Sequence, residues 1–356
     1  MIAVSVQAQR SREKCPPGVR VTMAGYYGFG NFGDELLAEA SIEALLRCGV
    51  GRGQIVLLSN APEESARRFG VDAVDRWQPG RVREVLRRSE TLLLGGGGLF
   101  QDATSLRSCL YYWGLVRMAY FLGVVPWALG QSVGPLSTRT GRWMTRDALQ
   151  CCRVVQVRDD ASRAVCHSLG APVEPGHDLA LSLSGLFGKG KPPLALTKKF
   201  PSKKFLINLR PCADDLPERF ARAVAEGLAS GSEPLGVALS ESDERLMACL
   251  MERKILPPMP VLRIVDASGA ARVWSGAAGA AGMRLHFAVL SALAGTPLTL
   301  APYDPKVRAF AESHNIPVWR EGPLPTPRPA EKGPTPGSVR KEIDALCRRV
   351  LSGVLI

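Results

Sequence analysis

Two cations stand close together in the stretch "GMRLHF", residues 282–287, within a small and apolar neighbourhood. Arg284 and His286 are two positions apart, after a small-residue strand pattern and a turn at Gly282, and a helix is predicted to begin near Leu285. The N-terminal end of a helix is partly positive, so a cation there costs about 0.3–1 kcal/mol, whereas a bound anion reverses that cost. The stretch therefore predicts an anion-binding site.

Two more cations follow predicted strands. Lys306 of "YDPKV" lies in the next loop of the same half of the chain, and Arg158 of "VRDDASR" ends a strand in the first half, with Asp159 as a helix cap. A lone lysine is usually a solvated side chain. We nevertheless expect Arg284, His286 and Lys306 to converge on one small polyanion.

The first loop, "AGYYGFGNFGDELL", holds Gly28, Gly30 and Gly33 in the order G-x-G-x-x-G, between a strand and a helix. That is the context of a dinucleotide site. Two features argue against one: Asp34 lies where a pyrophosphate would bind, and the second strand ends in "LLSN" without an acidic residue for a ribose. A tight turn, with Asp34 stabilised at the positive helix end, explains the loop without a ligand.

Other loops after strands offer polar groups or exposed backbone. Four glycines, 95–98, allow backbone N–H groups to approach a ligand, although a close strand-to-helix crossing explains them equally well. Gln131 and Ser132 of "LGQSVGPL" suit sugar hydroxyls, and Asp178 of "GHDLALSL" lies near the cleft between the two halves. The candidate substrate-binding residues in these loops are Gly30, Asn31, Gly96, Gly97, Asp102, Gln131 and Ser132.

The elements that position these loops are short apolar runs alternating with helical patterns, which predicts parallel α/β sheets. The strand candidates are "VRVTMAG", "QIVLLS", "TLLLGG", "VVPWALG" and "RVVQVR" in the first half, and "FLINLR", "PLGVALS", "PVLRIV", "AAGAAGM" and "TPLTLAP" in the second. Ligands of such sheets bind beyond the carboxyl ends of the strands, so two sets of loops can face one cleft.

The predicted organisation is two domains with tails. The ranges are a tail at 1–18, a Rossmann-like domain at 19–184, a linker at 185–203, a second Rossmann-like domain at 204–321, and a Pro-rich connection with a C-terminal helix at 322–356. That closing helix can return onto the first domain.

Composition narrows the class of protein. Hydrophobic residues make up 46% and charged residues 22%, which is globular composition and excludes overall disorder. A net charge of +12 favours anionic partners such as phosphorylated metabolites, nucleic acid or an acidic membrane surface. Without a spanning apolar run or a signal-peptide pattern, we expect a cytoplasmic protein, soluble or at the membrane surface. Nine cysteines without a CxxC pair argue against a disulfide framework or a zinc site.

Seven motifs occur in an order that resembles the polysaccharide pyruvyl transferases. They are "GYYGFGNFGDE", "GGGGLFQD", "LGQSVGPL", "RDDAS", "HDLAL", "GMRLHF" and "YDPKV", spread from about residue 20 to residue 310. The closest likeness is to the bacterial CsaB branch, which pyruvylates cell-wall polysaccharide. The resemblance implies a GT-B-like pair of Rossmann-type domains, in which the first domain (19–184) binds the acceptor and the second (204–321) binds the donor. It also implies transfer of an enolpyruvyl-derived group from phosphoenolpyruvate to a sugar, forming a 4,6-linked pyruvate ketal.

The resemblance also assigns the donor site. In that family the "RLH" motif, the lysine of "DPK" and an arginine like that of "RDDAS" are associated with phosphoenolpyruvate. Here these are Arg284, Leu285, His286, Lys306 and Arg158. The assignment agrees with the residues themselves, because the phosphate and carboxylate of phosphoenolpyruvate need several positive groups.

The expected acid–base groups are a histidine and two aspartates. His286 is the candidate acid, because an imidazole ordinarily titrates near neutral pH. Asp34 or Asp178 would orient or deprotonate the sugar.

The expected partners follow from the resemblance. The acceptor is a lipid-linked saccharide, with N-acetylmannosamine as the sugar that the closest likeness suggests, and an anionic membrane suits the basic surface. We expect no cofactor and no metal, with phosphoenolpyruvate as the donor substrate. The alternatives are a GT-B glycosyltransferase that uses a nucleotide sugar, and a nucleic-acid-binding protein, against which the basic residues are dispersed. No oligomeric state is predicted.

Overall fold

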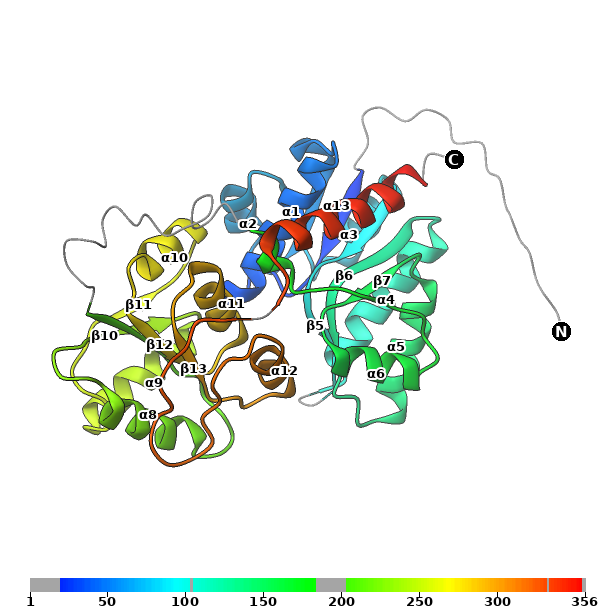
Figure 1. Cartoon of the computed structure of the whole chain (residues 1–356). Coiled ribbons are helices and arrows are strands. Elements are labelled where there is room, and N and C mark those ends of the chain that lie inside the picture. The colour runs from blue at the N-terminus through cyan, green and yellow to red at the C-terminus, as the bar shows by residue number, and fades with distance from the viewer. Residues whose placement is uncertain (1–19, 103–104, 184–202, 332, 354–356) are drawn as a thin grey trace.

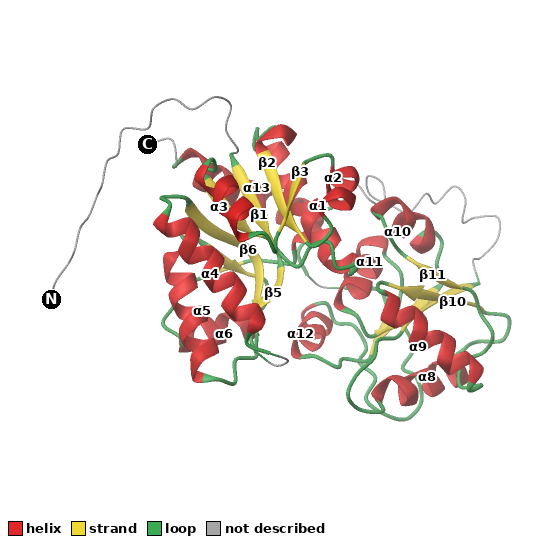
Figure 2. Cartoon of the chain, turned by 180° about the vertical axis from the view of Figure 1, so that it is seen from behind, coloured by secondary structure: helices red, strands yellow, loops and turns green. Residues whose placement is uncertain are grey.

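The computed structural model describes residues 20–102, 105–183, 203–331 and 333–353. Two lobes, each with its own parallel sheet, lie side by side (Figures 1 and 2). This is the α/β architecture of two Rossmann-type units that the alternating pattern predicts.

The first sheet has the strand order β3-β2-β1-β4-β6-β7-β8, with β5 paired to β6, and its pairings are parallel. Its strands are β1 Val21–Ala24, β2 Ile55–Ser59, β3 Asp72–Asp75, β4 Thr91–Leu94, β5 Gly97–Phe100, β6 Val125–Val133, β7 Val155–Val157 and β8 Glu174–Pro175. The helices of this lobe are α1 Phe32–Arg47, α2 Pro62–Phe69, α3 Pro79–Arg87, α4 Arg107–Phe121, α5 Arg139–Cys151 and α6 Asp160–Ser168, with short 3-10 turns at η1 Arg52–Gln54 and η2 Leu179–Ser182.

The second sheet has the order β11-β10-β9-β12-β13 and is also parallel. Its strands are β9 Lys204–Asn208, β10 Glu233–Ala238, β11 Val261–Arg263, β12 Gly279–Gly282 and β13 Leu298–Leu300. Its helices are α8 Leu216–Gly227, α9 Glu241–Glu252, α10 Ala267–Trp274, α11 Leu285–Ala294 and α12 Pro305–Ser313.

All ten predicted strands are confirmed, but three strands of the first lobe escape prediction. β3 reads "DAVD" and β8 has only two residues, so neither forms an apolar run. β5 begins inside the glycine loop, where Gly97 has a φ of +123°. Glycine alone adopts that backbone readily, which allows a glycine-rich segment to join the sheet beside β6.

The lobes share one apolar core where α1 and α11 meet. Buried side chains of α1, η2 and α11 belong to a single hydrophobic cluster, which includes Leu37, Leu179 and Phe287. The backbone N–H of Phe32 donates to the carbonyl of Leu239 across the lobes at 2.9 Å. This contact holds the N-terminal end of α1 against the segment that follows β10.

The last helix, α13 Pro336–Ser352, returns to the first lobe and packs on α1 (Figure 1). Arg47 donates to both carboxylate oxygens of Asp344 at 2.8–3.1 Å, and Gln156 Nε2 donates to Glu342 at 2.7 Å. The return of the closing helix that the sequence allows is therefore confirmed.

The predicted domain boundaries stay a prediction. The tail at 1–18 lies outside the described residues, and so does the linker at 185–203 except for Lys203. Among the described residues, no helix is both long enough and apolar enough to cross a membrane.

Candidate active site

A cleft of about 1000 Å³ opens between the lobes, beyond the carboxyl ends of β7 and β13. Arg158 and Asp178 line it from the first lobe, and Leu285 and Lys306 line it from the second. The cleft is rich in ionisable side chains; the others are Asp159, Asp160, Arg163, His177, Asp304, Arg308, Glu312 and His314. It therefore suits a small charged ligand.

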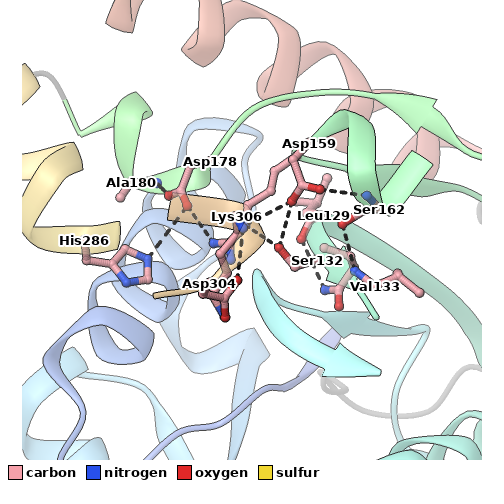
Figure 3. A network of polar contacts seen from close by, with 12 residues as sticks. Leu129, Ser132, Val133, Asp159, Ser162, Asp178, Ala180, His286, Asp304 and Lys306 are labelled. Carbon is pink, nitrogen blue, oxygen red and sulfur yellow. Dashed lines mark hydrogen bonds and ion pairs between the residues drawn. The ribbon is translucent and has the colours of Figure 1, made fainter. Parts of the chain in front are cut away.

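A buried ion pair forms the inner wall of the cleft. Arg158, directly after β7, donates through NH1 to Asp178 Oδ2 at 2.6 Å, and both side chains are at most 5% exposed. Arg158 Nε also donates to Ser132 Oγ at 2.8 Å, and Ser132 donates to Asp159 at 2.9 Å (Figure 3). Burial is the largest single effect and would raise the pKa of Asp178, but the charges of Arg158 and His286, together with the hydrogen bonds from Ala180 and Arg158, outweigh it and lower the pKa. Asp178 is therefore a carboxylate at neutral pH.

His286 lies in the first turn of α11, just behind this wall, and neither it nor Asp34 is among the described residues that line the cleft. Its Nε2 is 3.8 Å from Asp178 Oδ2 and has no hydrogen-bond partner in the structure (Figure 3). Burial lowers the pKa of His286 to about 4, and the positive charges of Arg158 and Lys306 add to that effect against the attraction of Asp178. The expectation of an imidazole that titrates near neutral pH is therefore wrong, because His286 is neutral at that pH.

Asp34 is the group that titrates near neutral pH. It lies in the first turn of α1 and accepts a hydrogen bond from the side-chain amide of Asn31, which also caps the helix. Burial raises the pKa of Asp34 to about 7, against the lowering effect of the Lys306 charge. Gly97 leaves room for the carboxyl, because a Cβ there would lie 3.3 Å from Asp34 Oδ1. Asp34 can therefore give or take a proton at neutral pH.

Lys306 reaches the same place from the second lobe. It stands in the first turn of α12, where Asp304 caps the helix, and its Nζ lies 3.3 Å from Asp304 Oδ2. Its side chain is 31% exposed and lines the cleft. The predicted proximity of Lys306 to His286 agrees with this geometry, since the charge of Lys306 acts on both His286 and Asp34.

Arg284 is placed differently from the prediction. Its Nε and NH2 atoms donate to the two carboxylate oxygens of Asp243, both at 2.6 Å, and NH2 also donates to Ser240 Oγ at 2.7 Å. Asp243 is completely buried in α9, and Arg284 does not line the cleft. The buried carboxylate takes up the guanidinium, so Arg284 fixes α11 to α9, and it acts on His286 through its charge.

Three of the predicted loop residues are also structural. Gln131 is fully buried in β6, where its side-chain amide donates to the carbonyls of Leu94, Gly95 and Leu129. Asp102 accepts three hydrogen bonds of 2.6–2.7 Å from Ser137 and Thr138. Gly96 packs between Leu37 and Leu179. These groups hold the loops in place, and within this set of described residues only the buried Oε1 of Gln131 is left without a hydrogen-bond partner.

The other predicted loop residues lie around the site in different ways. Ser132 and Asn31 bond directly to Arg158 and Asp34. Gly30 lies at the turn before α1 with a φ of +71° and open space beside it.

Sequence reasoning does not predict an aromatic cluster that lies beyond the carboxyl ends of β1 and β3. Tyr26 stacks on Phe29 with ring centroids 4.0 Å apart, and the guanidinium of Arg76 lies 4.1 Å from the ring of Tyr111. Trp77 is 58% exposed and Tyr26 is 46% exposed. Burial, followed by the charge of Asp34, raises the pKa of Tyr26, which places this ring near the site. The aromatic run "GYYGF" is the signal that could have revealed half of it.

Metal ligands do not gather in the part of the chain that the structure describes: no three His, Cys, Asp or Glu side chains there could hold an ion together. The expectation of a site without metal or cofactor stays a prediction.

Glycine at position 33 is what allows His286 to approach α1. A Cβ at this position would overlap the imidazole Nδ1 of His286. We expect Gly33→Ala to push the ring toward solvent and return its pKa from about 4 toward the ordinary value of 6.5. NMR titration of the four histidines measures this.

The matched control is Gly80→Ala in the first turn of α3, where an added Cβ meets nothing within 4 Å. It should leave the titration of His286 unchanged. An unchanged pKa of His286 in Gly33→Ala would contradict the packing described here.

Solved structures similar to this chain include sugar-nucleotide enzymes. Anabaena HepE in complex with UDP and glucose matches with a TM-score of 0.55 and 10% identity, covering 94% of this chain and 95% of that one. A putative UDP-N-acetylglucosamine 2-epimerase from Listeria monocytogenes matches with a TM-score of 0.57 and 9% identity, covering 95% and 90%. The epimerase of Methanocaldococcus jannaschii gives 0.54 and 8%, covering 92% and 98%. At these identities the likeness shows the fold alone, which is GT-B-like.

The family is shown by sequence. A comparison with curated proteins gives no match. The family model "Polysaccharide pyruvyl transferase" matches residues 31–305, which is most of the chain and spans the segments that carry Asp34, Arg158, Asp178 and His286. The chain therefore belongs to the polysaccharide pyruvyl transferase family.

Proposed function

We propose that the chain transfers the enolpyruvyl-derived group of phosphoenolpyruvate to a sugar, forming a 4,6-pyruvate ketal and releasing phosphate. The acceptor that we propose is an N-acetylmannosamine unit of a lipid-linked cell-wall glycan precursor, as in the CsaB branch. The observation that carries the proposal is the meeting of Arg158, His286 and Lys306 with two carboxyls in different protonation states, in a chain of this family. Pairs of acids with separated pKa values are typical of sites that move protons.

The donor binds against Lys306 in this proposal. Lys306 is partly exposed, lines the cleft and stands at the positive end of α12, all of which favour an anionic phosphate. Arg158 already donates to Asp178 and Ser132, so it contributes mainly through its charge. Arg284, occupied by Asp243, supports the site by fixing α11.

The reaction needs one proton delivered to carbon and two removed from hydroxyls. Protonation of the donor methylene makes the adjacent carbon electrophilic, and the first sugar hydroxyl attacks it and loses its proton. Phosphate then leaves with the electron pair of its C–O bond and carries away one of the two removed protons, and the second hydroxyl attacks the same carbon and loses its proton, which closes the ketal. The other removed proton replaces the one that was delivered to carbon. We assign the delivered proton to His286, whose imidazolium Asp178 would stabilise, and the proton removal to Asp34.

His286 is neutral near pH 7, so in this proposal it must gain a proton when the donor binds. A bound dianionic phosphate raises the pKa of a neighbouring imidazole, because it favours the charged form. We therefore expect phosphoenolpyruvate to bind with uptake of a proton near pH 6. Calorimetry in two buffers of different ionisation enthalpy measures that uptake.

Two variants sharpen the binding experiment. His286→Gln should bind the donor without proton uptake, and Lys306→Ala should bind it at least tenfold more weakly through loss of a charged hydrogen bond of about 1.5–3 kcal/mol. Arg222→Ala, an exposed site on α8, is the control and should change neither quantity. Wild-type binding without proton uptake would contradict the role of His286.

The alternative activity is glycosyl transfer from a nucleotide sugar. The GT-B-like fold and the HepE complex with UDP and glucose are what favour it. The same calorimetry separates the two readings: UDP-glucose should give no heat of binding with this chain. Binding of UDP-glucose together with no response to phosphoenolpyruvate would replace the pyruvyl transfer proposal.

The acceptor sugar in our proposal stacks on the aromatic cluster of Tyr26, Phe29 and Trp77. Exposed rings suit the apolar faces of sugars, and Tyr26 lies close enough to Asp34 for their charges to interact. This places sugar hydroxyls on the side of the site where Asp34 can accept a proton.

A further inference from the structure

Large apolar side chains are exposed together on two helices of the first lobe, away from the cleft. On α4, Leu110, Tyr120 and Phe121 are 52%, 55% and 73% exposed, and on α5 Trp143 is 55% exposed. None of the four lines the interlobe cleft. Exposed apolar groups that gather in one area mark an interaction surface more often than a neutral one.

These residues share one face, which we name the α4–α5 face. Residues 110, 113, 117, 120 and 121 recur at helical spacing on α4, and residues 139, 143 and 146 do so on α5. The two helices lie side by side (Figure 2), joined by the rings of Trp113 and Trp143 at 5.5 Å and by a hydrogen bond of 2.7 Å from Trp113 Nε1 to Asp147.

The charge of this region is strongly biased. Residues 105–153 contain six arginines and one acid, Asp147, with no lysine or glutamate, a net charge of +5. The arginines are Arg107, Arg117, Arg139, Arg142, Arg146 and Arg153. Arg117 lies 4.7 Å from the ring of Phe121, so cation and aromatic ring form one surface. Aromatic rings beside arginines are the combination found where proteins enter the headgroup region of a membrane.

We propose that the α4–α5 face docks peripherally on an anionic lipid bilayer. Phe121, Tyr120 and Trp143 enter the headgroup region, and Arg139 and Arg146, which are exposed on α5, bind lipid phosphates. A second copy of the chain fits the face poorly, because the self-paired surfaces would bring two sets of arginines together. The proposal concerns a surface and goes beyond the function proposed for the cleft.

Docking in this way has a consequence for the acceptor. α4 and α5 follow β5 and β6 in the chain, so their N-terminal ends lie at the carboxyl ends of these strands, the side on which the cleft opens. Trp143, early in α5, lies toward this side, whereas Tyr120 and Phe121 lie at the opposite, C-terminal end of α4, so only the α5 end of the docked face would bring the membrane, and with it a lipid-carried sugar, near the cleft. This consequence rests on the proposed function, whereas the docking does not.

Flotation of the full chain with lipid vesicles tests the docking. The chain should bind vesicles of phosphatidylcholine with phosphatidylglycerol, should not bind phosphatidylcholine alone, and should lose binding at high salt. The Arg139→Gln/Arg146→Gln and Phe121→Ser/Trp143→Ser double variants should each lower the partition coefficient at least tenfold. The changed side chains are exposed, so the melting temperature should stay the same.

A matched control uses exposed apolar side chains of the other lobe. Leu262→Ser/Val265→Ser should bind vesicles like the wild type. The proposal is overturned if the wild type does not bind the anionic vesicles, or if the α4–α5 variants bind as well as the control. It is also overturned if light scattering shows a dimer that the same variants abolish without lipid. Donor binding, measured on the same samples, should be unaffected, which separates failure of the docking from failure of the proposed activity.

Discussion

Replacing Asp34 with asparagine is expected to lower kcat by about 10²–10⁴-fold, the range typical of general acid–base groups. Asparagine keeps the size and the neighbouring amide contact of Asp34, but it has no proton to exchange. The loss should therefore fall on kcat, with little change in the KM for the donor. Steady-state phosphate release measures both constants.

The same variant should be more stable than the wild type at about pH 8. The pKa of Asp34 is raised to about 7 in the folded chain, so the folded chain binds more protons than the unfolded one between the two pKa values. The free energy of unfolding therefore falls as the pH rises through that window and stays low above it. Asparagine does not ionise and so does not lose stability in this way. The melting temperature of Asp34→Asn should therefore exceed that of the wild type by more at about pH 8 than at about pH 5.

Asp72→Asn, an exposed carboxyl on β3, is the control and should change neither kcat nor the pH dependence of stability. If kcat of Asp34→Asn remained within threefold of the wild type, Asp34 would have no part in proton transfer. A melting temperature that does not rise at high pH would contradict its raised pKa.

Asp178→Ala should lower the free energy of unfolding by about 3–5 kcal/mol, because it leaves Arg158 as an unpaired buried charge. The pair is only 2.6 Å apart and at most 5% exposed. Since the pKa of Asp178 is lowered in the folded chain, this stabilisation is present above the ordinary aspartate pKa and is lost as the pH falls below it. Urea unfolding near neutral pH measures the loss.

A surface pair gives the comparison. Arg163 and Asp160 are 2.9 Å apart but 45% and 88% exposed, so Asp160→Ala should cost less than about 1 kcal/mol. The double variant Arg158→Met/Asp178→Leu should recover much of the stability lost in Asp178→Ala, yet remain inactive. Equal losses for the buried and the surface variants would show that the pair does not stabilise the fold.

The sheets of this protein could be predicted because their strands are long apolar runs between glycine- and proline-rich turns. Exceptions occur where a strand has no such run, as in β3, or where positive φ at Gly97 brings a glycine loop into the sheet as β5. Arg158, Asp178 and Lys306 lie in loops of the kind that follow the strands of parallel sheets. The prediction that these residues line one cleft is correct.

The sequence does not predict which side chain pairs with Arg284, or how deeply His286 and Asp34 are buried. Nothing in "GMRLHF" shows that Asp243, forty-one positions earlier, takes up the guanidinium of Arg284. The pKa values of His286 and Asp34 are moved in opposite senses by burial, which depends on how the lobes pack and not on local spacing. The sequence therefore singled out the two side chains to which we propose acid–base roles, but it misjudged which of them titrates near neutral pH.

The measurement that tests the central claim most directly is phosphate release from phosphoenolpyruvate with a lipid-linked acceptor containing N-acetylmannosamine, followed by mass analysis of the product. We expect acceptor-dependent release, a product with the added mass of a pyruvate ketal, and loss of both in His286→Ala. No release with any sugar acceptor, together with transfer from a nucleotide sugar, would contradict pyruvyl transfer and assign the cleft to glycosyl transfer.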